Sequence, residues 1–163
     1  MQETYLGSLG NYRKGSIEII KGKPGYYAMS NVFEVASHAA PYEKVVVGKN
    51  LKYVIETVRA EGVSPWFSAS HDEFAVVLDG EIDVHFIKPS DGPLVNADTE
   101  GSVRIEGEPA GQPMGYVRLR RGHQALLPAG TAYRFEARLT GVLLVQTILG
   151  SCSVEKWAEI CIQ

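Results

Sequence analysis

Residues 71 to 80, with the sequence HDEFAVVLDG, constrain the fold of this chain more than any other stretch. The apolar run FAVVL has the length of a buried strand. It is followed by Asp79-Gly80, a dipeptide typical of tight turns because glycine readily adopts the positive φ that such turns need. We therefore predict a strand, a hairpin turn at Gly80 and an antiparallel return over residues 81 to 87.

Both faces of this predicted strand are apolar, with Ala75 and Val77 on one side and Phe74, Val76 and Leu78 on the other. A strand that lacks a polar face has to be covered on both sides. The second cover is either the N-terminal arm, another sheet of the same chain, or a different chain. Because exposed apolar patches are costly, we expect a contact with another subunit.

The composition is that of an ordinary globular domain. With 163 residues, 45% of them hydrophobic, the chain is long enough for one sizeable core, so we predict a single domain over residues 1 to 163. There are 16 basic and 19 acidic residues, and a net charge of −3 leaves no basic surplus for nucleic acid. No apolar run is long enough to span a membrane, and the N-terminus lacks the pattern of a signal peptide. We expect a cytoplasmic location.

Short strand-length runs separated by turn residues fill most of the chain. Residues 1 to 30 are predicted to form an irregular arm, because glycines interrupt them too often for a helix, with a short strand over residues 16 to 20. Residues 89 to 115 hold four prolines and five glycines and are interpreted as a long loop or flap, in which residues 102 to 106 resemble a strand. A short helix capped by Ser153 is expected at the C-terminus. Further strands are predicted over residues 31 to 36, 43 to 48, 51 to 60, 116 to 119, 124 to 127, 132 to 137 and 142 to 149.

Two glycine-containing signatures give this all-β pattern a family likeness. Glu73 and Gly80 stand seven residues apart, and Gly122, Pro128 and Gly130 repeat the spacing G-x5-P-x-G. Together they resemble the two motifs of the cupin superfamily. The resemblance implies an all-β, cupin-like double-stranded β-helix (jelly roll) with an N-terminal arm and a short C-terminal helix.

Metal-binding cupins carry a first motif of the form G-x5-H-x-H-x3-4-E-x6-G. Glu73 occupies the carboxylate position here, but the paired-histidine positions fall on Phe67 and Ala69, or on Trp66 and Ser68 with the longer spacer. Neither pair offers imidazole ligands. Against this motif, both histidine ligands are therefore missing and only the glutamate remains.

The second motif, G-x5-P-x-G-x2-H-x3-N, has Tyr133 at its histidine position. We therefore predict that this chain binds no metal. An alternative stays open, in which His71, Glu73, His123 and Tyr133 form a rearranged site, because imidazole and carboxylate donors together can hold non-haem iron.

The same residues also have purely structural interpretations. Glu73 is a candidate for an inward carboxylate paired with Arg118 or Arg120. These arginines belong to the densest basic cluster of the chain, which is most simply a solvated or ion-paired strand face. The histidines are then hydrogen-bonded side chains at loops and turns.

A second resemblance is more specific. The stretch YEKVVVGKNLKYVIETVRAEGVSPWF followed by HDEFAVVLDGEIDVHFIK is similar to the small subunit of two-component hydroquinone 1,2-dioxygenases. The resemblance implies a heterotetramer of two small and two large subunits, in which the large subunit carries non-haem Fe(II). The small subunit stabilises its partner and borders the active site where hydroquinone is cleaved to 4-hydroxymuconic semialdehyde. It implies no catalytic residue in this chain and a contact of Trp66 and Phe67 with the aromatic diol. The alternative for these two rings is that they simply plug the barrel.

Two other functions remain open at this point. One is a self-contained metallo-cupin dioxygenase or lyase that uses the rearranged ligand set named above. The other is a metal-free cupin that isomerises or binds a small molecule, for which a histidine and an acidic or tyrosine partner should converge inside the barrel.

Overall fold

The fold is described from a computed structural model, which describes residues 7–12, 18–23 and 30–161. No helix in these described ranges is long and apolar enough to cross a bilayer. The elements follow one another as α1 (Val32–His38), β1 (Lys44–Asn50), β2 (Tyr53–Val63), β3 (Trp66–Ala69), β4 (Glu73–Asp79), β5 (Glu81–Pro89), β6 (Ser102–Ile105), β7 (Gly111–Arg120), β8 (Gln124–Leu127), β9 (Ala132–Ile148), β10 (Ser153–Val154) and α2 (Trp157–Ile160).

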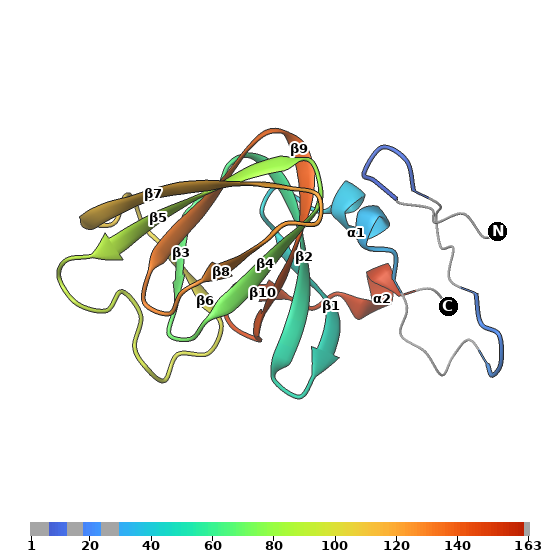
Figure 1. Cartoon of the computed structure of the whole chain (residues 1–163). Coiled ribbons are helices and arrows are strands. Elements are labelled where there is room, and N and C mark those ends of the chain that lie inside the picture. Colours follow the sequence, from blue (N-terminus) through green and yellow to red (C-terminus); the bar gives the residue numbers. More distant parts are fainter. Residues whose placement is uncertain (1–6, 13–17, 24–29, 162–163) are drawn as a thin grey trace.

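All of these strands belong to one sheet that curls around a common core (Figure 1). The strand that holds the sheet together is β9, which has 17 residues and pairs with β2, β3, β4 and β5. The sequence predicts two strands here, over residues 132 to 137 and 142 to 149, but the structure joins them into one. The all-β, cupin-like architecture with a short C-terminal helix is confirmed.

The predicted hairpin at Gly80 is wrong. Strands β4 and β5 both pair antiparallel with β9, from Phe74 opposite Gln146 to Ile87 opposite Ala132, and they therefore run in the same direction. Gly80, with φ of +80°, is a bend in one long path, not a reversal. Its backbone packs so closely on Gly141 that a Cβ at Gly80 would lie 3.0 Å from the Gly141 Cα. Two facing glycines thus allow neighbouring strands to bend at the same corner.

The core fills the interior of the curled sheet. On β4 the inward side chains Ala75 and Val77 are fully buried, whereas Phe74 on the outer side is 45% exposed. The sequence predicted two apolar faces for this strand. The described residues of this chain cover the inner face completely and the outer face only in part, since Val76 and Leu78 are half-buried there. The largest buried cluster comprises Tyr42, Val58, Ala60, Phe67, Ala75, Val77, Ile82, Val84, Leu119, Leu127, Tyr133, Phe135, Ala137, Leu143 and Val145.

Two local predictions are wrong for identifiable reasons. Residues 31 to 36 begin a helix, because the Asn31 side chain accepts hydrogen bonds from the N–H groups of Phe33 and Glu34. The flap predicted over residues 89 to 115 is shorter, because β7 already begins at Gly111 and pairs with β5. Pro113 of β7 lies on an edge strand beside a bulge, where a missing backbone N–H is tolerated.

The two ends of the chain are partly described. Ser153 does not cap α2, whose N-cap residue is Lys156. The Ser153 hydroxyl donates instead to the Glu56 carboxylate, at 2.6 Å. Much of the predicted arm lies outside the described residues, including residues 16 and 17 of the predicted strand, and residues 18 to 20 are not in a strand. Within the described part, the Leu9 N–H donates to the Asp79 carboxylate at 2.8 Å. The single-domain boundary stays a prediction.

Candidate functional site

The residues at the cupin ligand positions lie inside the barrel. All four residues of β3 are buried, and the pairing of β3 with β9 places Phe67 opposite Tyr133. Glu73, the first residue of β4, is fully buried as well. Three positions of the two sequence motifs therefore meet in the interior, as the resemblance to cupins predicts.

A chain of hydrogen bonds connects these positions. The Tyr133 hydroxyl donates to Glu73 Oε2 at 2.6 Å and accepts a hydrogen bond from Lys44 Nζ at 3.3 Å. Lys44 Nζ also donates to Ser102 Oγ at 2.6 Å. The ammonium lies 4.3 Å from the centre of the Phe67 ring, within the range of a cation–π contact. The interior therefore contains an acid, a phenol and an ammonium in sequence.

Burial controls the protonation states in this interior. Burial, followed by the nearby Glu73 charge, raises the pKa of Tyr133 well above its usual value, so the phenol keeps its proton and remains a donor. Burial also raises the pKa of Glu56, although the Lys44 charge and the Ser153 hydroxyl act in the opposite direction. Lys44 is the one basic residue among the described buried side chains.

Several polar atoms here lack a partner. Glu73 Oε1, Glu56 Oε2 and Ser68 Oγ are buried without a hydrogen-bond partner. Such atoms are costly in a protein interior, and for a carboxylate the cost falls when a cation is nearby. This makes the position of Lys44 important for the whole cluster.

The proposed rearranged ligands are only partly brought together. Glu73 and Tyr133 are hydrogen-bonded, but His71 Nε2 is engaged with the Thr147 hydroxyl at 3.0 Å. His123 lies on the exposed turn before β8, where its Nδ1 accepts the N–H of Arg120 at 3.1 Å. In the part of the chain that the structure describes, no three histidine, cysteine or acidic side chains are placed to hold a metal ion.

A metal ion of the kind that cupins bind does not fit the residues present. Phe67 and Ala69 offer no donor atom, and Tyr133 donates its proton instead of offering a lone pair to a cation. The Lys44 ammonium would also repel a second cation. Of the usual ligands only the Glu73 carboxylate remains.

Trp66 and Phe67, predicted to contact substrate, are packed in the interior. Trp66 is 6% exposed, clusters with Ile87 and Ala132, and has the Arg134 guanidinium 4.8 Å above its ring. Phe67 is 4% exposed and belongs to the main core. Their contact with substrate stays a prediction.

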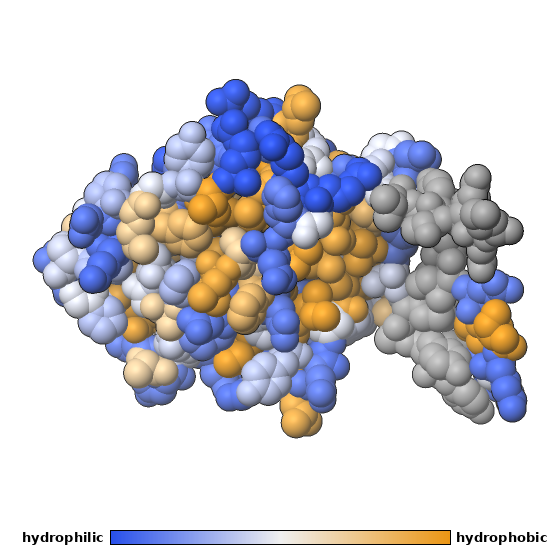
Figure 2. Space-filling model, in the orientation of Figure 1, coloured by the Kyte–Doolittle hydropathy of each residue, from blue (hydrophilic) through white to orange (hydrophobic). Residues whose placement is uncertain are grey.

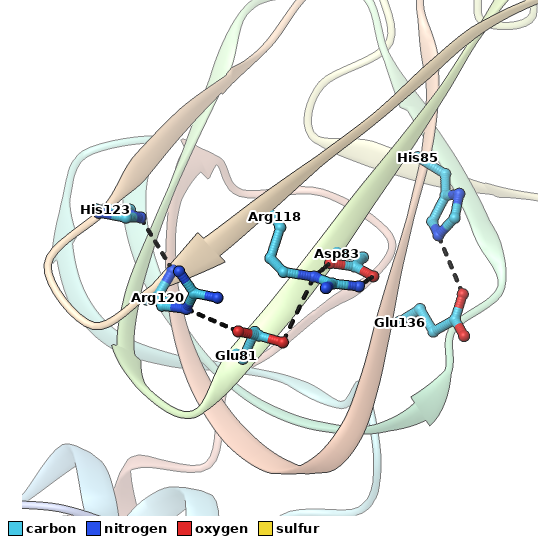
Figure 3. Close-up of polar contacts among 7 residues, drawn as sticks. All are labelled: Glu81, Asp83, His85, Arg118, Arg120, His123 and Glu136. Atoms are coloured by element: carbon cyan, nitrogen blue, oxygen red, sulfur yellow. Dashed lines mark hydrogen bonds and ion pairs between the residues drawn. The ribbon is translucent and has the colours of Figure 1, made fainter.

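The basic cluster forms an ion-paired outer face, as the structural interpretation predicts (Figure 3). Arg118 on β7 grips the Asp83 carboxylate on β5 with two hydrogen bonds, of 2.8 and 2.9 Å. Arg120 binds Glu81 at 2.7 Å. The alternative pairing of Glu73 with Arg118 or Arg120 is wrong, because Asp83 and Glu81 on the outer face engage these two arginines.

Lys44 and Ser102 are the parts of the site that the sequence analysis missed. A lysine at the start of a strand is ordinarily solvated, so the local pattern around Lys44 carries no signal. The sequence around Glu56 did carry a signal for this site, because Glu56 lies between Val54 and Val58 on the core-facing side of β2. A buried carboxylate at such a position calls for an internal cation.

The fold and its interior define a cupin-type barrel whose usual metal ligands have been replaced. No family model matches the chain, and no curated protein matches it. A cupin-2 domain protein from Shewanella frigidimarina NCIMB 400 shares the fold, with a TM-score of 0.50, 15% identity and coverage of 71% of this chain and 89% of that one.

Two solved structures are far more similar. Hydroquinone 1,2-dioxygenase PnpCD, in complex with Cd2+ and 4-hydroxybenzonitrile, has a chain 60% identical to this one, with a TM-score of 0.92 and coverage of 100% of this chain and 98% of that one. The hydroquinone 1,2-dioxygenase of Sphingomonas sp. TTNP3, with 4-hydroxybenzoate bound, has a chain 53% identical, with a TM-score of 0.93 and coverage of 100% and 99%. This chain belongs to the hydroquinone 1,2-dioxygenase family and is a subunit of an enzyme of that family.

The PnpCD enzyme also has a longer chain of related shape. In its complex with Fe3+, that longer chain matches 83% of this chain with 37% of its own length, at 14% identity and a TM-score of 0.61. A second, larger chain with a similar domain thus exists in that enzyme.

Proposed function

We propose that this chain is the small, metal-free subunit of an Fe(II)-dependent hydroquinone 1,2-dioxygenase. The observation that carries the proposal is the full-length identity of 60% to a chain of PnpCD, combined with an interior whose ligand positions hold Phe67, Ala69 and Tyr133. The iron is then carried by the larger subunit. In the proposed heterotetramer, two copies of each subunit assemble in the cytoplasm.

The proposed reaction cleaves an aromatic diol with molecular oxygen. Hydroquinone and O₂ combine to give 4-hydroxymuconic semialdehyde, in which both oxygen atoms are retained and one ring carbon–carbon bond is broken. The metal of the larger subunit supplies the oxygen chemistry. This chain supplies no group to that step; its contribution is to stabilise the larger subunit and to border its active site.

An apolar outer face supports the proposed assembly. Ile55, Phe74, Val76 and Leu144 line a groove of about 290 Å³ on the outer surface of β2, β4 and β9, with Gln124 and Gln146 beside them. Figure 2 shows hydrophobic side chains on this side of the molecule, separated by hydrophilic ones. Apolar patches of this type on a small domain are typical of subunit interfaces.

We propose an indirect role for Trp66 and Phe67 at the border of the substrate pocket. Both rings are buried, so they would shape this border from within instead of stacking face to face with the diol. The Arg134 guanidinium lies over Trp66, and Phe67 and Arg104 line a common pocket. Arg134 is half-buried and lies directly over Trp66, which connects the buried ring to the surface.

The proposal is tested by separating and recombining the two subunits. Each chain is purified alone, loaded with Fe(II) without oxygen and assayed for oxygen uptake and product absorbance with hydroquinone; metal content is measured in parallel. We expect activity only in the reconstituted complex, and less than one-tenth equivalent of metal in this chain. Ring cleavage by this chain alone, with one equivalent of metal that is lost on Glu73→Ala or His71→Ala substitution, would establish the self-contained metallo-cupin. A stable homodimer that ignores the larger subunit and isomerises a small molecule would establish the third function.

A further inference from the structure

The interior of the barrel contains its own positive charge. Lys44 begins β1 and is only 2% exposed, with its ammonium turned into the barrel. Its contacts are the Ser102 hydroxyl at 2.6 Å, the Tyr133 hydroxyl at 3.3 Å and the face of the Phe67 ring at 4.3 Å. A lysine is almost never buried to this degree unless its charge is matched nearby.

The matching charges are two buried carboxylates. Glu73 and Glu56 are both fully buried, and each has one oxygen without a hydrogen-bond partner. Lys44 reaches Glu73 through the Tyr133 hydroxyl, and its charge acts directly on Glu56. No other described basic residue is buried, so the ammonium alone balances these acids from within the barrel.

The position of the ammonium is more specific than its charge. Phe67 and Tyr133, which the ammonium contacts, stand at two of the three histidine positions of the metal-binding motifs. Glu73, which accepts a hydrogen bond from Tyr133, stands at the glutamate position. The cation therefore lies where the ligands of a metal would converge. An aromatic face and a hydroxyl oxygen are also suitable partners for an ammonium.

We propose that the Lys44 ammonium takes the place of the metal ion in this barrel and makes its folding independent of metal. Lys44 then balances the Glu73 and Glu56 charges, and it excludes divalent cations by repulsion. Restoring the histidines alone should therefore not create a metal site while Lys44 remains.

The first test restores the histidines with and without the lysine. Phe67→His, Ala69→His and Tyr133→His are combined in the full-length chain, once with Lys44 and once with Lys44→Met. Co²⁺ is the probe, and its binding is measured by titration calorimetry and by the visible absorption of the bound ion. We expect one Co²⁺ per chain in the Lys44→Met background and binding on the order of 100-fold weaker with Lys44 present. Equal Co²⁺ affinity in the two backgrounds overturns the proposal.

The second test needs no grafted ligands and stands where those variants do not fold. Lys44→Met is compared in the natural chain and in a Glu56→Gln/Glu73→Gln background, with the exposed Lys52→Met as the matched control. We expect Lys44→Met to lower the melting temperature by about 5 °C or more in the natural chain, since it leaves buried carboxylates unbalanced. The loss should fall by at least half once the acids are neutral. An equal loss in both backgrounds means that Lys44 only fills space, and overturns the proposal.

Discussion

The Tyr133 hydroxyl lies 2.6 Å from Glu73 Oε2 and holds this fully buried carboxylate inside the barrel. The pair joins the two sequence motifs across 60 residues of chain. Because burial and the Glu73 charge raise the pKa of Tyr133 well above its usual value, the phenol keeps its proton at neutral pH and donates this hydrogen bond.

Removing the Tyr133 hydroxyl is expected to destabilise the protein. Tyr133→Phe leaves the fully buried Glu73 without its donor, which should lower the free energy of unfolding by about 1–3 kcal/mol. Urea denaturation measures the loss. Tyr116→Phe, at an exposed tyrosine on β7, is the matched control and should change the free energy little. Equal effects of the two substitutions would argue against a structural role for the Tyr133–Glu73 bond.

The corner formed by Gly80 and Gly141 is sensitive to any added side chain. A Cβ at Gly141 would lie 2.7 Å from the Asp79 carbonyl oxygen, so Gly141→Ala should cost about 1–3 kcal/mol of unfolding free energy. Gly48→Ala is the control, because its new Cβ makes only ordinary contacts with Ile55. Thermal unfolding of both variants decides the point, and a neutral Gly141→Ala would show that the corner can relax.

The Arg118–Asp83 pair gives the protein a pH dependence in acid. Two hydrogen bonds from Arg118 lower the pKa of Asp83 below its usual value. A depressed folded-state pKa stabilises the protein above the unfolded-state pKa, and this contribution is lost as the pH falls through the folded-state value. Asp83→Asn should therefore unfold with a shallower dependence on pH between about 5 and 2. Asp98→Asn, at an exposed loop residue, should leave the wild-type slope unchanged.

The outer apolar face gives the clearest test of assembly. Phe74→Asp introduces a charge at the centre of this face, and we expect affinity for the larger subunit to fall at least about tenfold. Leu139→Asp is the control, since this residue is also well exposed but lies outside the groove. Analytical ultracentrifugation of mixtures gives the affinities. Undiminished assembly of Phe74→Asp would place the interface elsewhere.

Trp66 separates a packing role from a role in turnover. Trp66→Ala should destabilise the chain by about 3–5 kcal/mol, because a large buried ring is lost. Trp66→Phe keeps most of the packing but changes the contact with Arg134. If Trp66 borders the substrate pocket, Trp66→Phe should leave the complex assembled and reduce kcat/KM for hydroquinone. Unchanged kinetics with an intact complex would restrict Trp66 to packing.

Local sequence patterns were sufficient to predict those strands whose conformation does not depend on contacts with distant parts of the chain. Strand β8 occupies residues 124 to 127, as predicted, and the apolar run of β4 was correctly recognised as a strand. The helix after Asn31 was missed although its signal was present, namely an asparagine followed three residues later by Glu34. The β-branched and aromatic residues there outweighed that signal.

The remaining errors concern contacts between distant parts of the chain. Asp79-Gly80 is a good hairpin signal, but the pairing of both β4 and β5 with the distant strand β9, which brings Gly141 against Gly80, makes it a bend. Lys44 is held inside the barrel by hydrogen bonds to Ser102 and Tyr133, which are 58 and 89 residues away in the sequence. No window of local sequence contains such a site, so it becomes visible only when the barrel is closed.

The long strand β9 has a consequence for synthesis of the protein. It supplies the partner edge for β2, β3, β4 and β5, but it is made after all of them. During synthesis on the ribosome, the edges of these four strands that pair with β9 therefore stay unpaired until residues 132 to 148 emerge from the exit tunnel. Such non-local pairing slows folding and exposes the nascent chain to aggregation. Chaperone capture of ribosome-bound chains should therefore drop sharply once β9 has emerged, rather than decline gradually with chain length.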